Sequence, residues 1–294
     1  MVPDTFAAFI LTHKRPDRQL TLNTLNRSGY TGKTYLVVDN EDPTIGEYQR
    51  LYGNMVIVFD KREAWELTDD ADNTGQAKGV VYARNMCWSI AKSLGLKHFI
   101  VLDDDYTTFG YRFNSSLNYG WFAIRSTFDN LMLRLVQLIE QSPIVCVAMA
   151  QGGDHFGGSE STRNKNGPIA LRKVMNTFVC ATDRPFKFYG RINEDTTAYV
   201  TLGRRGMLFL TMQQVMCTQL QTQSNPGGLT EIYLDAGTYY KSFLSVMWEP
   251  SCVKVATMGT TDRRIHHKVN WAKAVPCIVR ESLRKPDDEV PDGN

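Results

Sequence analysis

The 294-residue chain lacks the features that mark several special classes of protein. No run of about 18 or more apolar residues occurs, so the sequence predicts no membrane-spanning segment. The start does not resemble a signal peptide, because its basic residues follow the short apolar run instead of preceding it. The 33 Lys and Arg nearly balance the 31 Asp and Glu, which excludes a polycation that holds nucleic acid by bulk charge but leaves room for a local basic groove.

The six cysteines contain no Cys-x-x-Cys pair and are scattered, mostly within apolar stretches. This pattern favours reduced, buried thiols over disulfides or a zinc cluster. The composition, with 43% hydrophobic and 22% charged residues, is that of a globular protein. Together these features predict a cytoplasmic protein that does not contact membranes.

The first half of the chain alternates short apolar runs with helical patterns, at 16–28 and 80–94. Such an alternation of continuous apolar strands and helices predicts an α/β fold with a mostly parallel sheet flanked by helices. In these sheets the ligand lies beyond the carboxyl ends of the strands. The predicted strands are Phe6–Leu11, Tyr35–Val38, Met55–Phe59 and His98–Leu102.

The second half is less regular, and no repeat or linker divides it from the first. We expect mobile loops at 60–79 and 151–168 and a disordered tail at 285–294. Strands are predicted at 144–149, 177–181 and 253–256, and helices at 128–141, 193–206 and within 225–241.

Three carboxylates directly follow the fourth predicted strand. In an extended chain alternate side chains point the same way, so Asp103 and Asp105 can converge while Asp104 points elsewhere. Carboxylate oxygens suit Mg²⁺ or Mn²⁺, although a solvated acidic turn would have the same sequence. Arg84, on the helix before this strand, is a candidate partner for a carboxylate or a phosphate, or a surface residue.

Later residues offer further candidates. Glu194 and Asp195 open a predicted helix, where acids act as capping residues or, if their pKa is raised, as a general base. His266 and His267 are surface residues or metal ligands. Lys241 is a phosphate contact or a cation at a helix end.

The motifs VVDN, ARN, LDDD and NED, in this order, resemble the GT-A class of nucleotide-sugar glycosyltransferases. More narrowly, 79–109, GRINEDTTAYVTLGRRG and RIHHKVNW are similar to the TET/JBP-associated glycosyltransferases, a largely phage-encoded family that decorates hydroxymethylated pyrimidines in DNA. The resemblance extends from about Phe6 to Trp271. It implies a single GT-A domain over 1–284, with a nucleotide-sugar half at 1–110 and an acceptor half at 111–284.

The resemblance also implies roles for individual residues. The catalytic carboxylates would be Asp195, as first choice, and Glu194. The metal ligands would be Asp103, Asp105 and one of His266 and His267. The residues expected to bind the donor are Thr12, Arg15, Asp39, Arg84 and Asp104, with Lys241 as a candidate phosphate contact.

The expected activity is the metal-dependent transfer of a sugar from a nucleoside-diphosphate sugar, with UDP expected from the class, to a hydroxymethylated or already modified pyrimidine in phage DNA. Mn²⁺ or Mg²⁺ would be the cofactor, and the host cytoplasm the location. A GT-A enzyme with a protein or carbohydrate acceptor, and an inactive nucleic-acid-binding scaffold, are the alternatives. A locally basic stretch favours DNA, although such residues also occur on any solvated surface. It comprises Arg163, Lys165, Arg172, Lys173, Arg184, Lys187, Arg191, Arg204 and Arg205.

Overall fold

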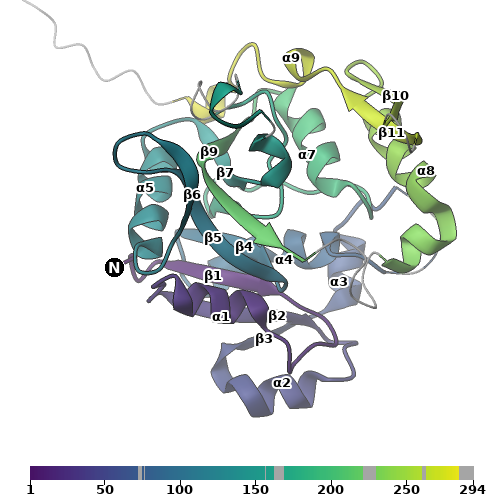
Figure 1. Ribbon diagram of the computed structural model, residues 1–294. Helices are drawn as coiled ribbons and strands as arrows, with labels where there is room; N and C mark the ends of the chain where they lie inside the picture. Colours follow the sequence, from purple (N-terminus) through teal and green to yellow (C-terminus); the bar gives the residue numbers. More distant parts are fainter. Residues whose placement is uncertain are drawn as a thin grey trace, which may run out of the picture.

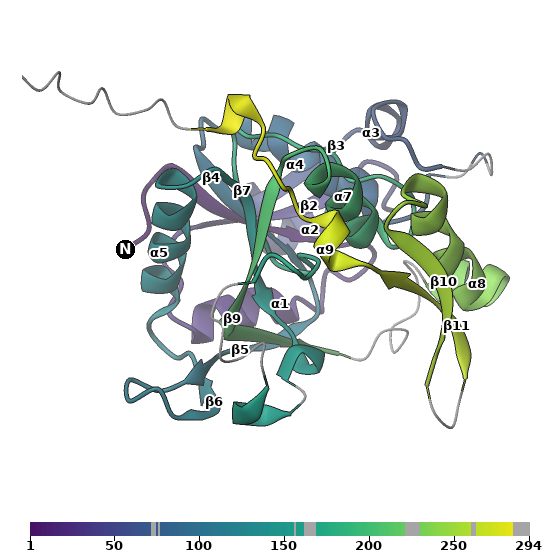
Figure 2. The ribbon, with the colours of Figure 1, turned by 90° about the horizontal axis from the view of Figure 1, so that it is seen from above.

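The computed structural model describes residues 1–71, 75, 77–155, 157–161, 169–220, 230–259 and 263–284, and of 230–238 only the backbone. Within these residues nine strands form one sheet, and two more form a separate hairpin. Figure 1 and Figure 2 show how the helices lie around the large sheet. The strands are β1 (Phe6–Leu11), β2 (Lys33–Asp39), β3 (Val56–Phe59), β4 (His98–Asp103), β5 (Tyr106–Phe113), β6 (Tyr119–Ala123), β7 (Ile144–Ala150), β8 (Phe178–Ala181), β9 (Leu208–Gln219), β10 (Val253–Met258) and β11 (Arg264–Val269). The helices are α1 (Leu20–Arg27), α2 (Ile45–Tyr52), α3 (Lys61–Glu66), α4 (Val81–Ser93), α5 (Phe128–Glu140), α7 (Glu194–Gly203), α8 (Thr230–Trp248) and α9 (Trp271–Ala274).

The strands of the large sheet are ordered β3-β2-β1-β4-β8-β7-β9-β5-β6. The pairs β1–β2, β2–β3, β1–β4 and β7–β9 are parallel, whereas β8 runs antiparallel to β4 and β7, and β5 runs antiparallel to β9 and β6. Seven of these nine strands therefore point in one direction, and only β8 and β5 point in the other. The predicted α/β fold with a mostly parallel sheet is confirmed.

Both faces of the sheet are covered, so its central strands are apolar throughout. All six residues of β1 are buried. Ala7 and Phe9 belong to the core under α4 and α7, whereas Ala8 and Ile10 belong to the core under α1, α2 and α5. A strand between two cores needs apolar side chains on both faces, and this explains why the apolar runs predicted β1, β4 and β7 correctly.

Several expectations need correction. The first helix begins at Leu20 rather than near residue 16. The stretch 60–79, expected to be a mobile loop, contains α3. The side chain of Asp60 caps the N-terminus of α3 by accepting a 2.9 Å hydrogen bond from the Glu63 amide. All six cysteines lie in the described part of the chain and are free, but Cys277 is exposed. No described helix is long and apolar enough to cross a membrane. The tail at 285–294 lies outside the described residues.

Candidate active site

The carboxyl ends of β1, β2 and β4 bring the predicted site residues to one edge of the sheet. Leu11, the last residue of β1, is paired with Asp103, the last residue of β4. Asp39 ends the neighbouring strand β2. The loops that follow these three strands therefore share one edge, as the sequence predicted.

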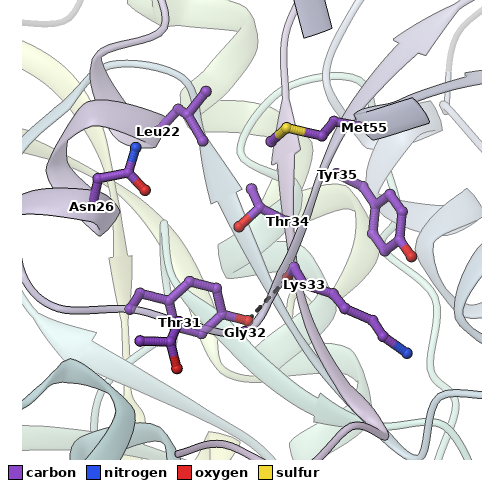
Figure 3. A pocket seen from close by; sticks show the side chains of 9 residues that line it. Leu22, Asn26, Thr31, Gly32, Lys33, Thr34, Tyr35 and Met55 are labelled. Atoms are coloured by element: carbon purple, nitrogen blue, oxygen red, sulfur yellow. Dashed lines mark hydrogen bonds between the residues drawn. The ribbon is translucent and has the colours of Figure 1, made fainter. Parts of the chain in front are cut away.

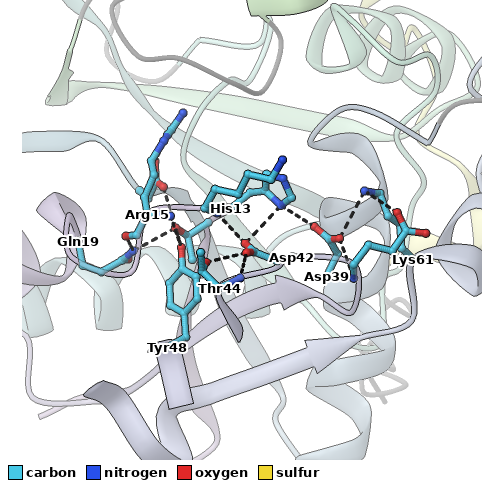
Figure 4. Close-up of polar contacts among 12 residues, drawn as sticks. His13, Arg15, Gln19, Asp39, Asp42, Thr44, Tyr48 and Lys61 are labelled. Atoms are coloured by element: carbon cyan, nitrogen blue, oxygen red, sulfur yellow. Dashed lines mark hydrogen bonds and ion pairs between the residues drawn. The ribbon is translucent and has the colours of Figure 1, made fainter. Parts of the chain in front are cut away.

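Asp104 turns toward the loop after β1. Its carboxylate accepts a hydrogen bond of 2.8 Å from the Thr12 hydroxyl and one of 2.9 Å from the Arg15 guanidinium. The hydroxyl of Tyr48, on α2, lies 2.8 Å from Thr12 Oγ1 and accepts from the Arg15 backbone amide (Figure 4). Burial raises the pKa of Asp104 although Arg15 and Thr12 act against it. Thr12, Arg15 and Asp104 thus form one buried network.

Asp39 belongs to a second network, beside the first (Figure 4). His13 Nδ1 lies 2.8 Å from one Asp39 oxygen and 3.4 Å from Asp42, and Lys61 Nζ lies 3.3 Å from the other Asp39 oxygen. Burial alone would raise the pKa of Asp39, but His13 and Lys61 lower it below its usual value. Asp39 is therefore an ionised carboxylate held between two basic side chains.

Arg84 connects the turn after β4 to the start of α7. Its guanidinium donates to Glu194 and, over 3.1 Å, to Asp103 Oδ1. The guanidinium also lies 4.9 Å from the centre of the Phe178 ring. Burial lowers the pKa of a guanidinium, yet Asp103 and Glu194 raise that of Arg84 above its usual value. Burial raises the pKa of Glu194, against the effect of Arg84.

Asp195 follows Glu194 in the first turn of α7, but it has a different partner. Its Oδ2 lies 2.7 Å from Lys173 Nζ, and the two side chains are only 12% and 16% exposed. Burial would raise the pKa of Asp195, but Lys173, followed by Lys241, holds it well below its usual value. Burial lowers the pKa of Lys173 although Asp195 opposes this. The two predicted catalytic carboxylates therefore differ: Asp195 is firmly ionised, and Glu194 is bound by Arg84.

Asn193 connects the start of α7 to α8 and β11. Its backbone is in the left-handed region, at φ 62°, which asparagine tolerates better than most residues. Its side-chain amide donates to Ser245 Oγ over 2.6 Å and lies 3.3 Å from His267 Nδ1. Burial, and then the charge of Lys173, lower the pKa of His267 to about 3. His267 is thus a neutral imidazole at the edge of the Asp195 environment.

His266 lies on β11 next to His267, with its Nδ1 2.6 Å from the His267 backbone carbonyl. Burial lowers its pKa, and the charge of Lys241 adds to this effect. The charge of Lys241 also lowers the pKa of Asp195, so Lys241 lies on the same side of α7 as Asp195.

The predicted metal ligands do not form one cluster. Within the described residues no group of three or more His, Cys, Asp and Glu side chains is arranged to hold a metal ion, so neither histidine joins Asp103 and Asp105. The Asp103 side chain is 30% exposed, and Asp105 is also partly exposed. Burial, together with the charges of Asp103 and Asp104, raises the pKa of Asp105 to about 7. The turn thus carries a concentrated negative charge, and the metal role of these residues stays a prediction.

Most of the basic residues predicted to follow DNA phosphates are engaged inside the protein. Arg184 donates to three backbone carbonyls within 2.8 Å, those of Ile139, Ser142 and Ile144. Others pair with carboxylates: Arg172 with Asp154, Lys173 with Asp195, Arg191 with Asp70, and Arg204 with Glu249. Arg163 and Lys165 lie outside the described residues. These five residues therefore have partners within the protein, although Arg204 lies at the surface, and the basic DNA surface stays a prediction.

His13 and Lys61 were not assigned to the site from the sequence, and Lys173 was placed in the basic stretch that favours DNA. His13 follows β1 directly, and its position beside Thr12 was a usable signal. Lys61 and Lys173 meet their carboxylates only in the folded chain.

A pocket of about 530 Å³ lies at the amino end of β2, opposite the strand ends that carry the candidate site (Figure 3). It is lined by Leu22, Lys33 and Met55 among others.

A family model described as TET-Associated Glycosyltransferase matches residues 6–228 of the chain. No curated protein matches it. Among solved structures, glucosyl-3-phosphoglycerate synthase from Mycobacterium tuberculosis, in complex with Mn²⁺, UDP and phosphoglyceric acid, is similar over 90% of this chain and 87% of its own, with 12% identity and a TM-score of 0.46. The mannosyltransferase PcManGT from Pyrobaculum calidifontis, with GDP-Man and Mn²⁺, is similar over 76% and 59%, with 11% identity and a TM-score of 0.43. TarS 1-349 from S. aureus, with UDP-GlcNAc, is similar over 80% and 63%, with 11% identity and a TM-score of 0.46.

The family match spans well over half of the chain and includes the ARN, LDDD and NED motifs. These motifs supply Arg84, Asp103 and Glu194, the three residues that the structure connects by hydrogen bonds. The sheet and its flanking helices form the GT-A-like α/β architecture that the sequence predicted. The chain belongs to the TET-associated glycosyltransferase family and is a glycosyltransferase.

Proposed function

We propose that this enzyme transfers a sugar from a nucleoside-diphosphate sugar, with UDP as the expected nucleotide, to a hydroxymethylated or already modified pyrimidine base in DNA, with Mn²⁺ or Mg²⁺ as cofactor. The observation that carries the proposal is the bridge from Asp103 through Arg84 to Glu194. It fixes the turn expected to hold the donor relative to the helix expected to face the acceptor. Transfer between two bound substrates depends on such a fixed relation, because orientation alone supplies much of the rate.

The chemistry of the turn fits a divalent cation. Asp103 and Asp105 are partly exposed carboxylates on one turn, and Mg²⁺ is commonly bound by one or two carboxylates together with substrate phosphates. When bound there, the cation would neutralise the diphosphate that leaves. Thr12, Arg15 and Asp104 brace this turn against the loop after β1, and Asp39 lies beside them toward the nucleoside end of the donor.

Asp195 is the carboxylate proposed to act on the acceptor. Lys173 keeps it ionised, whereas Glu194 is occupied by Arg84. In our proposal Asp195 orients the acceptor hydroxyl and takes its proton late, after the new glycosidic bond has begun to form and has made that proton strongly acidic. The lowered pKa of Asp195 makes it a weak base, contrary to the raised pKa that was expected of a general base from the sequence. Lys241, whose charge reaches Asp195, contributes positive charge toward the leaving diphosphate.

A DNA acceptor is supported by the family to which the chain belongs. A base within a duplex is reached by turning it out of the stack, so its hydroxymethyl group would enter the site beside Asp195. Neither turning the base out of the duplex nor transferring the sugar to it requires a membrane, and no described helix could cross one.

The direct test combines the protein with Mn²⁺ or Mg²⁺, a panel of nucleoside-diphosphate sugars, and duplex DNA containing hydroxymethylcytosine or hydroxymethyluracil. The DNA is then digested and its nucleosides are analysed by mass spectrometry, with Asp105→Ala as control. A nucleoside heavier by one sugar, absent with the variant, supports the proposal. Metal-dependent hydrolysis of the donor with no heavier nucleoside would preserve the donor site and refute the DNA acceptor.

A further inference from the structure

The hairpin formed by β5 and β6 is an exposed aromatic surface at the margin of the large sheet. β6 is the last strand in the sheet order, and Figure 2 shows it on the side away from α8. Trp121 is 39% exposed and Leu117 in the turn is 80% exposed, whereas Phe122, which is 38% exposed, lies on the opposite face of β6, over Gly120. Edge strands with exposed apolar side chains are a liability for a monomer, so a surface of this kind requires an explanation.

A basic side chain lies among these rings. The Arg112 guanidinium is 4.5 Å from the centre of the Tyr119 ring and 5.9 Å from that of Trp121, and it donates to the Tyr119 hydroxyl. The only charged residues between positions 106 and 128 are Arg112 and Arg125, and Arg125 is exposed. The hairpin therefore presents aromatic faces and positive charge without any acidic residue of its own.

Trp121 is held in place by the backbone of the neighbouring strand. A Cβ atom added at Gly110, on β5, would lie 2.6 Å from the Trp121 ring, so the indole rests directly on this glycine. Aromatic rings commonly cover glycines in this way on sheet edges. The indole is thus held in place while the residue stays 39% exposed.

The hairpin is continuous with the candidate active site. β5 begins at Tyr106, directly after Asp105, and the Tyr106 hydroxyl lies 3.5 Å from Asp103 Oδ2. Arg112 comes six residues later, which in an extended strand is about 20 Å away. That distance is the rise of about six base pairs of DNA.

We infer that the β5–β6 hairpin binds the DNA that flanks the target base, about six base pairs from it. This inference rests on the proposed function. Positive charge and apolar rings without acids match a polyanion: the two arginines would contact phosphates, and the exposed part of Trp121 would pack on the deoxyribose rings, because the base faces of a duplex are already stacked on one another. In the 172–204 stretch Arg172, Lys173 and Arg191 pair with carboxylates of the protein, and the hairpin adds exposed aromatic rings to its positive charge.

The test measures DNA affinity by fluorescence anisotropy on duplexes with a central hydroxymethylated base and flanking arms of 3, 6 or 10 base pairs, each arm varied separately. For the wild type, affinity should increase when one arm passes about six base pairs. Trp121→Ala should remove that increase and weaken binding to the long duplex ~10-fold, because the buried part of an interface tryptophan commonly dominates binding. Trp121→Phe should restore most of it. Gly110→Ala, which displaces the indole without removing it, should weaken binding in the same direction.

Charge is tested separately. Arg125→Ala should lower the slope of log affinity against log salt by about 1, whereas Trp121→Ala should leave the slope unchanged. Trp65→Ala is the matched control, because Trp65 on α3 is similarly exposed, at 37%, and it should bind every duplex like the wild type.

The outcomes separate this inference from the proposed function. If the wild type binds no DNA on any arm length, both fail. If it binds and modifies DNA while Trp121→Ala behaves like the wild type, only the hairpin inference is overturned. Sedimentation velocity gives the last alternative: a wild-type dimer that Trp121→Ala converts to a monomer would show that the hairpin contacts a second copy of the chain instead.

Discussion

Replacing Lys173 by methionine is expected to destabilise the enzyme and to change how its activity depends on pH. The substitution keeps most of the side-chain volume and removes the ammonium group 2.7 Å from Asp195. Asp195 would then be a buried carboxylate without its closest counter-ion. Its pKa, now held below the usual value, should rise.

The expected loss of unfolding free energy in Lys173→Met follows from how deeply the ion pair is buried. Both side chains are less than one-fifth exposed, so this is a buried ion pair. Removing one partner of such a pair costs roughly 3–5 kcal/mol when the other charge is left uncompensated, and the lower end, about 3 kcal/mol, is expected here because Lys241 still acts on Asp195. Lys61 offers a matched comparison, since its side chain is also 16% exposed and also pairs with a buried aspartate, Asp39. There His13 remains as a second partner, and the loss for Lys61→Met should be nearer about 1.5 kcal/mol.

Urea unfolding at pH 7, followed by circular dichroism, gives both free energies by linear extrapolation. A second series covers pH 3–7. A carboxylate with a lowered pKa contributes stability above its unfolded pKa, near 4, and loses that stability as the pH falls through its folded pKa. Relative to the wild type, the deficit of Lys173→Met should therefore be complete above the raised pKa of Asp195 in the variant, and shrink as the pH falls through that pKa.

Activity supplies the third readout. Because Lys173 lowers the pKa of Asp195, Lys173→Met should move the acid limb of the pH–rate profile to higher pH. The reasoning is refuted if Lys173→Met loses no more stability than Lys61→Met, or if its pH–rate profile coincides with that of the wild type.

Three further predictions concern single groups. In metal-free buffer Asp105→Asn should raise the urea midpoint more at pH 8 than at pH 4, because a carboxyl whose pKa is raised to about 7 loses stability as the pH rises from about 4 through 7; equal effects at both pH values would contradict this. Arg84→Lys should lower the rate at saturating donor at least ~10-fold, because a single ammonium cannot make the forked contacts to Asp103 and Glu194, and an unchanged rate would exclude the bridge from the mechanism. A thiol reagent should modify one cysteine, Cys277, in the native protein and six after unfolding in guanidinium; fast reaction of a second native thiol would show that a buried cysteine opens.

The sequence predicted the strands that read as apolar runs, including the less buried β3 and β10, and missed β5, β6, β9 and β11. β1 and β7 are buried along their whole length and read as continuous apolar runs. In β9 the apolar start at Leu208 is followed by Thr211 and Gln213 at buried positions, which interrupt the apolar pattern. β11 is largely exposed and carries the two histidines, so its sequence indicated ligands and not a strand.

The same division applies to the site. Residues that stand together in the sequence, such as the three aspartates after β4 or Glu194 and Asp195, could be recognised as motifs. Their partners could not, because Lys173 and Asp195 meet only when the loop before β8 packs on α7. The different states of Glu194 and Asp195 depend on these distant partners, and this is why spacing alone could not separate their roles.

The position of β8 has a consequence for how the enzyme is made. β8 pairs with β4 on one side and β7 on the other, so residues up to 181 must leave the ribosome before β4 gains its second neighbour. Until then an almost wholly apolar strand has an open edge, and pairing across such sequence distances is slow. A nascent or truncated chain ending near residue 110 is therefore expected to aggregate or to need a chaperone, and expression should favour the intact chain at low temperature.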